Sequence, residues 1–163
     1  MQPQAEVAKL IRAELKRRGI PGSVHSKSFS MGNDVRVSLE DQPPDVIASL
    51  KEFCAPFERG HFDGMTDSYH YSNRRDDIPQ TKYLFIDNHM SAAMAQAIWH
   101  WLKHVQRYRE AELLPDLYSE AQYQRFGLHD CVDRMVWQTF NGSREGFWEA
   151  ESITDADYPE VVA

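Results

Sequence analysis

Cysteine is scarce in this sequence, which has two cysteines among 163 residues. This scarcity excludes a small domain held together by a disulfide framework. Cys54 and Cys131 each stand within an apolar pattern of helical spacing, where an intracellular thiol is usually a small buried hydrophobic side chain. We therefore predict two buried thiols and no structural disulfide.

A run of about 20 apolar residues, which a membrane-spanning helix needs, is also absent. The first residues, MQPQAEVAKLIRAELKRRG, are amphipathic and charged, and they lack the uninterrupted apolar centre of a secretory signal peptide. Both absences argue against a membrane protein. We expect a soluble, cytoplasmic protein, whose length and 42% hydrophobic content are enough for one buried core.

Positive charge is also in short supply. The sequence has 18 Lys and Arg but 25 Asp and Glu, so its formal net charge is -7. Proteins that hold nucleic acid by neutralising phosphates concentrate Lys and Arg, so this balance disfavours strong nucleic-acid binding. The charge is also uneven, because residues 1–40 have seven basic and four acidic side chains, whereas residues 143–163 have one basic and six acidic. An acidic end of this kind suits a basic groove on another protein.

Helical and alternating patterns occupy the first half of the chain. Apolar spacing predicts a helix over residues 5–18, which Gly19 and Pro21 would end. Alternation over residues 24–30 and 35–39 predicts a β-hairpin, and Pro43-Pro44 suits the first turn of a second helix. Residues 68–73 alternate as a third strand, and the apolar stretch within residues 82–87 is typical of a strand covered on both faces or of a central one.

These elements predict an α+β fold with two layers, in which an antiparallel sheet of the four strand segments carries the helices on one face. Ser91 is a good N-cap for a helix reaching about Arg109, and patterns near residues 120–126 and 129–140 predict a helical C-terminal extension. We divide the chain into an α+β domain over residues 1–109 and an extension over residues 110–163, which has an acidic tail and packs on the same core. A mostly helical domain with one peripheral hairpin is the alternative.

Several motifs follow one another in a defined order in this part of the chain. KLIRAELK is followed by SVHSKSFS, a Gly-containing turn, DVRVSL, a helix opened by proline, FDGMTDSY and KYLFIDNHMS. In these motifs the chain resembles the large polyvalent protein-associated domain 29 family, found in proteins of phage and plasmid mobile elements. The resemblance implies a fold and a mobile-element origin. Because polyvalent proteins are thought to blunt host defences, it also implies an inhibitor of a host defence system, of the anti-CRISPR or anti-restriction type.

Such an inhibitor would bind a host defence protein or ribonucleoprotein complex without catalysis. The acidic tail is the candidate surface, because aromatic side chains surrounded by charge are a common interface composition. The candidate partner-binding residues are Glu145, Phe147, Trp148, Glu149, Glu151, Asp155 and Asp157. The same residues also fit a solvated tail whose aromatic side chains fold back onto the core.

A second hypothesis is a single-stranded nucleic-acid-binding module. Basic, histidine and aromatic side chains on neighbouring strands could form a sheet face on which bases stack. The candidate residues for this face are His25, Lys27, Arg36, Tyr69 and Tyr71. The acidity of the whole chain argues against strong binding, so nucleic acid is not the favoured partner.

A third hypothesis is an enzyme centred on the segment HFDGMTD. His61, Asp63 and Asp67 offer an imidazole and two carboxylates within seven residues, which could bind a hard cation or exchange protons. The segment lacks the spacing of a calcium-binding loop, and Asp63-Gly64 has the composition of a turn. We therefore favour a structural role for these residues, and a non-enzymatic protein without a metal or cofactor.

Overall fold

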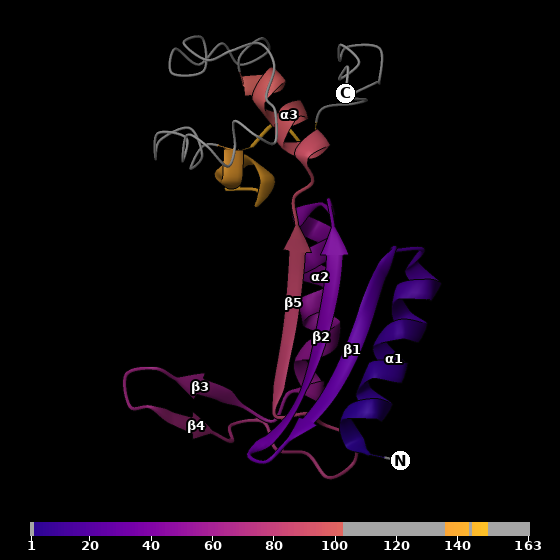
Figure 1. Ribbon diagram of the computed structural model, residues 1–163, viewed down its shortest axis with the longest axis vertical. Helices are drawn as coiled ribbons and strands as arrows, with labels where there is room; N and C mark the ends of the chain where they lie inside the picture. The colour runs from indigo at the N-terminus through magenta and orange to yellow at the C-terminus, as the bar shows by residue number, and fades with distance from the viewer. Residues whose placement is uncertain (1, 103–135, 144, 150–163) are drawn as a thin grey trace. The chain divides into compact units, whose positions relative to one another are not determined.

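The computed structural model describes residues 2–102, 136–143 and 145–149 (Figure 1). The chain divides into two compact units, Met1–His89 and Met90–Ala163, and each has its own cluster of buried apolar side chains. The boundary predicted near Arg109 lies outside the described residues. The fold of each unit follows from its own core.

Helix α1, Pro3–Arg18, opens the first unit and confirms the helix predicted from apolar spacing. Its stripe of Val7, Ile11 and Leu15 is buried. The helix ends where expected, because Gly19 adopts a left-handed conformation with a φ of 68°. A side chain at this position would be strained in that conformation, whereas glycine is not.

A mixed three-stranded sheet with the order β1-β2-β5 forms the second layer. β1, Gly22–Phe29, and β2, Gly32–Glu40, form the predicted antiparallel hairpin, whereas β5, Tyr83–His89, runs parallel to β2. The α+β class is confirmed, but the sheet is not purely antiparallel. Parallel neighbours require a long crossover, and the chain between β2 and β5 supplies one that contains helix α2, Pro44–Cys54.

The same crossover contains a short 3-10 helix, η1 (Ala55–Phe57), and a two-stranded ribbon of β3, His61–Asp63, and β4, Ser68–His70. In Figure 1 the ribbon extends away from the base of the sheet. The strand predicted around Tyr69 therefore exists, but it pairs with β3 and not with the main sheet. β4 pairs instead with its neighbour in sequence, across the four residues between Asp63 and Ser68.

Both helices of the first unit pack on one face of the sheet, as predicted. Alternation along β2 directs Val35, Val37 and Leu39 toward the helices, and each is at most 2% exposed. Cys54 of α2 joins this core, and burial raises the pKa of its thiol to about 12. Cys54 is therefore a core side chain rather than a reactive one. Cys131 lies outside the described residues.

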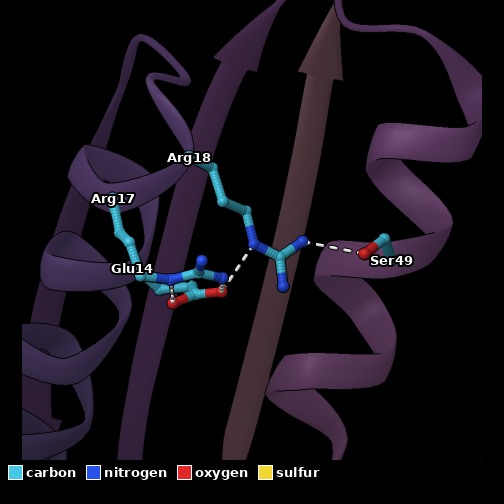
Figure 2. Close-up of polar contacts among 4 residues, drawn as sticks. All are labelled: Glu14, Arg17, Arg18 and Ser49. Atoms are coloured by element: carbon cyan, nitrogen blue, oxygen red, sulfur yellow. Dashed lines mark hydrogen bonds and ion pairs between the residues drawn. The ribbon is translucent and has the colours of Figure 1, made fainter.

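A charged cluster links the two helices of the first unit (Figure 2). Glu14 of α1 accepts hydrogen bonds from Arg17 at 2.6 and 2.8 Å and from Arg18 at 2.6 Å. Arg18 also donates to the hydroxyl of Ser49 in α2 at 2.8 Å. The hydrogen bonds from Arg17 and Arg18 lower the pKa of the Glu14 carboxyl to about 2. The cluster thus joins α1 to α2 beside the buried core.

We expect the variant Glu14→Gln to be less stable than the wild-type chain at neutral pH, and the difference to shrink in acid. The pKa of Glu14 is lower in the folded chain than its ordinary value of 4.5, so its contribution is present above that value and is lost as the pH falls toward 2. Thermal melts of both chains between pH 2 and pH 7 measure this effect. Equal melting temperatures at pH 7 would contradict it.

The second unit contains α3, Ala92–His100, whose predicted N-cap is confirmed because the Ser91 hydroxyl accepts the N–H of Met94 at 3.0 Å. Residues 136–140 are helical and are followed by a left-handed Gly142, the predicted stop. The largest fully buried side chains of this unit include Trp99, Leu102, Phe140 and Phe147. The helix predicted over residues 120–126 lies outside the described residues.

Every helix within the described residues is too short or too polar to span a membrane.

Candidate nucleic-acid interface

The sheet face turned away from α1 and α2 carries basic and aromatic side chains. Because Val35 and Val37 of β2 point toward the helices, Arg36 points to the opposite face, where the strand register places His25 and Phe85 beside it. The neighbouring row of the register adds a cation, a carboxylate and a ring, in Lys27, Asp34 and Tyr83. We define the open face as these two rows and Phe29: His25, Lys27, Phe29, Asp34, Arg36, Tyr83 and Phe85.

Three aromatic rings form a row along the open face. The rings of Phe29 and Tyr83 lie at 19° to each other with centroids 6.3 Å apart, and those of Tyr83 and Phe85 lie at 11° and 6.2 Å. Phe29 and Phe85 are each 39% exposed, although phenylalanine is among the most often buried residues. Nearly parallel, exposed rings provide a surface on which planar groups can stack.

Two cationic side chains lie over these rings. The Arg36 guanidinium carbon is 4.9 Å from the centroid of Phe85, and the Lys82 ammonium nitrogen is 5.3 Å from that of Tyr83. Arg36 pairs with Asp87 at 3.3 Å, but both side chains are partly exposed, so this ion pair contributes little energy and can exchange. Rings and cations together offer stacking and positive charge to an anionic, planar ligand.

The ribbon extends the row of rings. Tyr69 of β4 packs edge-on against Tyr83 at a centroid distance of 5.3 Å and against Tyr71 at 4.8 Å. The Tyr69 hydroxyl donates to the carbonyl of Lys82, and burial, followed by the charge of Glu58, raises the pKa of Tyr69 to about 12. Tyr69 thus stays neutral and holds the ribbon against β5. Tyr71, which is 57% exposed, continues the aromatic surface.

The structure brings together the residues predicted for a nucleic-acid face, since all of them lie on the open face or on the ribbon next to it: His25, Lys27, Arg36, Tyr69 and Tyr71. Four others are not found from the sequence: Phe29, Lys82, Tyr83 and Phe85. The interpretation of YLFI as a central or doubly covered strand is wrong, because β5 is an edge strand with Leu84 and Ile86 turned to the core and Phe85 exposed. The alternation of aromatic and aliphatic residues in that stretch is the signal that could have identified them.

The segment HFDGMTD forms the end of the ribbon. Asp63 accepts hydrogen bonds from the N–H of Met65 and the hydroxyl of Thr66, both at 2.9 Å, and these bonds lower the pKa of its carboxyl. Asp67 adopts a left-handed conformation with a φ of 49°, and His61 lies on β3 before the turn. The described residues contain no group of three His, Cys, Asp or Glu side chains placed to hold a metal. The hydrogen bonds of Asp63 are those of a turn.

The variant Asp63→Asn is expected to loosen this turn and to alter its pH dependence. The pKa of Asp63 lies below its ordinary value in the folded chain, so the carboxylate stabilises the turn above that value and its contribution is lost as the pH falls through the lowered pKa. Amide hydrogen exchange at Met65 measures the turn directly and should become faster. Asp67→Asn is the matched control, because asparagine tolerates a left-handed conformation. Equal exchange rates in both variants would contradict the role of Asp63.

The residues predicted to bind a partner through the C-terminal region are separated by the structure. Phe147 is 1% exposed and packs against Trp101 and Trp148, so its ring is not available to a partner. The apolar area of a large ring makes its burial favourable. The indole N–H of Trp148 donates to two backbone carbonyls at 3.2 and 3.0 Å. Glu145 and Glu149 are exposed, and the remaining three lie outside the described residues: Glu151, Asp155 and Asp157.

Fold and surface together define the first unit as an α+β domain with an exposed aromatic and basic sheet face. The family model for the large polyvalent protein associated domain 29 matches residues 2–93, more than half of the chain, and the chain belongs to this family. The domain is typical of the polyvalent proteins of mobile elements. Neither the curated proteins nor the solved structures yield a match. Because the matched residues include all described residues of the first unit, the open face lies within the family's domain.

Proposed function

We propose that the first unit binds single-stranded nucleic acid across the open face. The observation that supports this most is the row of Phe29, Tyr83 and Phe85, whose two end rings are exposed, with Arg36 and Lys82 over its rings. Such rings stack on bases of any sequence, while the cations attract backbone phosphates. In a duplex the bases already stack on one another, so this surface suits a single strand.

The net charge of the chain argues against such binding, but the charge is distributed unevenly between the units. Residues 1–89 contain twelve Lys and Arg against thirteen Asp and Glu, a balance of -1, whereas residues 90–163 contain six against twelve. The acidity therefore belongs almost wholly to the second unit. Exposed charges act over a Debye length of about 10 Å at 0.1 M salt, so the charges of the open face itself act on a strand that is bound there.

Fluorescence anisotropy with labelled oligonucleotides of mixed sequence tests this proposal on the full chain. We expect a single strand of about 12 nucleotides to bind more tightly than the corresponding duplex, and its affinity to fall as salt is raised. A duplex bound as tightly as the single strand would exclude stacking as the basis of binding. The absence of binding at low salt would overturn the proposal.

Membership of a mobile-element family supports a second proposal, in which the protein inhibits a host defence system of the anti-CRISPR or anti-restriction type. It would do so without catalysis, by binding a host protein or ribonucleoprotein complex. The acidic tail is the candidate contact in this case, and Glu145 and Glu149 are its exposed members within the described residues. An acidic surface can compete with nucleic acid for a basic groove.

Affinity capture from a host lysate, with and without nuclease, separates the two proposals. A defence complex that stays bound after nuclease treatment, and whose activity falls when purified protein is added, would support the inhibitor. Recovery of nucleic acid alone would favour the first proposal. A chain truncated after Gly142 isolates the contribution of the tail, and full inhibition by that chain would remove the tail from the mechanism.

A further inference from the structure

A polar hollow of about 430 Å³ lies next to the exposed ring of Tyr71 in the first unit. Three arginines line it, namely Arg59, which precedes the ribbon, and Arg74 and Arg75, which follow it. Pockets of about 300 to 1,000 Å³ are of the size that holds small-molecule ligands. The hollow is therefore large enough for one nucleotide and rich in the side chain best suited to phosphate.

Buried hydrogen bonds hold the arginine-bearing loop in place. Gln80 is 3% exposed, and its side-chain amide donates to the carbonyls of Pro56 and Asn73, both at 2.8 Å. Its side-chain oxygen accepts the backbone N–H of Arg75 at 2.8 Å. The backbone N–H of Asn73 in turn donates to the carbonyl of Arg59 at 2.9 Å. The three arginines are thus carried on a fixed backbone, which lowers the entropic cost of binding.

The carboxylates around the hollow engage the three arginines to different degrees. Arg74 and Arg75 pair with Asp76 and Asp77, at 3.9 and 2.5 Å. The single contact between Arg74 and Asp76 is long and exposed, so it contributes little energy and a phosphate can replace this carboxylate. Arg75 is held more firmly, because it donates to both oxygens of Asp77, at 3.0 and 2.5 Å. Within the described residues, Arg59 pairs with no carboxylate.

We infer that this hollow is a nucleotide subsite at the end of the open face, in which the arginines hold a phosphate and Tyr71 stacks on the attached base. The ring contacts from Phe85 through Tyr83 and Tyr69 to Tyr71 connect the two surfaces, so one strand can occupy both. The inference rests on the proposed binding of single-stranded nucleic acid. It adds the position at which a phosphate is held and the residues that hold it.

The test compares two charge-matched double variants in single-strand binding by the full chain. Arg59→Gln with Arg74→Gln removes two cations from the hollow, and Lys9→Gln with Lys16→Gln removes two exposed cations from α1. We expect the hollow variant to bind about tenfold more weakly at low salt. Log affinity falls as log salt rises, and we expect this dependence to be shallower in the hollow variant. The magnitude of the slope should decrease by about 0.7 for each phosphate that the variant no longer neutralises. The α1 variant should keep the wild-type slope, and Asp76→Asn should bind more tightly.

A second measurement tests the hollow without a strand. The side-chain Nε–H signals of Arg59 and Arg74 are followed by NMR while adenosine monophosphate, adenosine or inorganic phosphate is added. We expect the monophosphate to shift both signals at lower concentration than phosphate, adenosine to leave them in place, and Tyr71→Ala to abolish the advantage over phosphate. Equal slopes for the two double variants would overturn the subsite and leave binding at the open face intact. If the wild-type chain binds no single strand, arginine signals that stay unchanged on addition of adenosine monophosphate would refute the subsite. Shifts caused by the monophosphate alone would then show that the hollow is a mononucleotide site.

Discussion

Replacing Tyr83 and Phe85 together with alanine is expected to weaken the binding of single-stranded nucleic acid by about thirtyfold or more. Each base stacked on an aromatic ring contributes about 1–3 kcal/mol by alanine substitution, so removing two stacks has a larger effect than removing any single ion pair at this surface. Phe85 is 39% exposed, and both rings belong to the open face rather than to the buried core. The core of the unit should therefore survive. Because Tyr83 also packs against Tyr69 of the ribbon, circular dichroism and the melting temperature are measured before anisotropy.

Two controls separate stacking from a general reduction of apolar surface. Leu10→Ala removes a side chain that is 42% exposed on α1, the helix that packs on the other face of the sheet, and it should bind as the wild type does. Phe85→Tyr keeps an aromatic ring and should retain most of the affinity. Wild-type affinity in the double alanine variant would show that bases do not stack here. The open face would then have to serve another ligand.

Local signals in the sequence predict the parts of the fold that depend on neighbouring residues. Gly19 ends α1 and Ser91 caps α3 because each acts within one turn of its own helix. The hairpin of β1 and β2 is joined by a short turn, so its pairing is also local. The direction of β5 is not set by neighbouring residues, because a crossover of more than forty residues separates β5 from β2. A parallel and an antiparallel β5 would show the same alternation.

The candidate site shows the same division between local and distant information. Arg36 and His25 could be assigned to one face because they lie on strands joined by that short turn. Tyr83 and Phe85 join them only through the register of a strand that is distant in sequence. The hollow is still less visible, because NRRDDIPQT has no period and its arginines meet Arg59 only through hydrogen bonds of Gln80 and the backbone.

The second large effect is expected from Gly60→Ala, which should lower the stability of the first unit by about 1–3 kcal/mol or more. A Cβ atom at position 60 would lie 1.8 Å from the carbonyl oxygen of His70 and 3.0 Å from the Cα atom of Tyr71. Both are backbone atoms, so the clash cannot be relieved by a change of rotamer. The ribbon would have to move, and Tyr69 and Tyr71 would move with it. For a unit of this size, a decrease of about 1 kcal/mol lowers the melting temperature by about 4–8 °C.

Gly64→Ala is the matched control for this prediction, because it makes the same substitution in the same ribbon. Apart from its own residue and its two neighbours in the chain, a Cβ atom at position 64 would have no atom within 4 Å, so the expected change in stability is within about 0.5 kcal/mol. Displacement of Tyr71 by Gly60→Ala should also weaken nucleotide binding at the hollow, while Gly64→Ala leaves it unchanged. Equal melting temperatures and equal nucleotide affinities in the two variants would show that the close approach of Gly60 to β4 does not fix the ribbon. The packing of Tyr69 on Tyr83 would then have to hold the row of rings between the sheet and the hollow by itself.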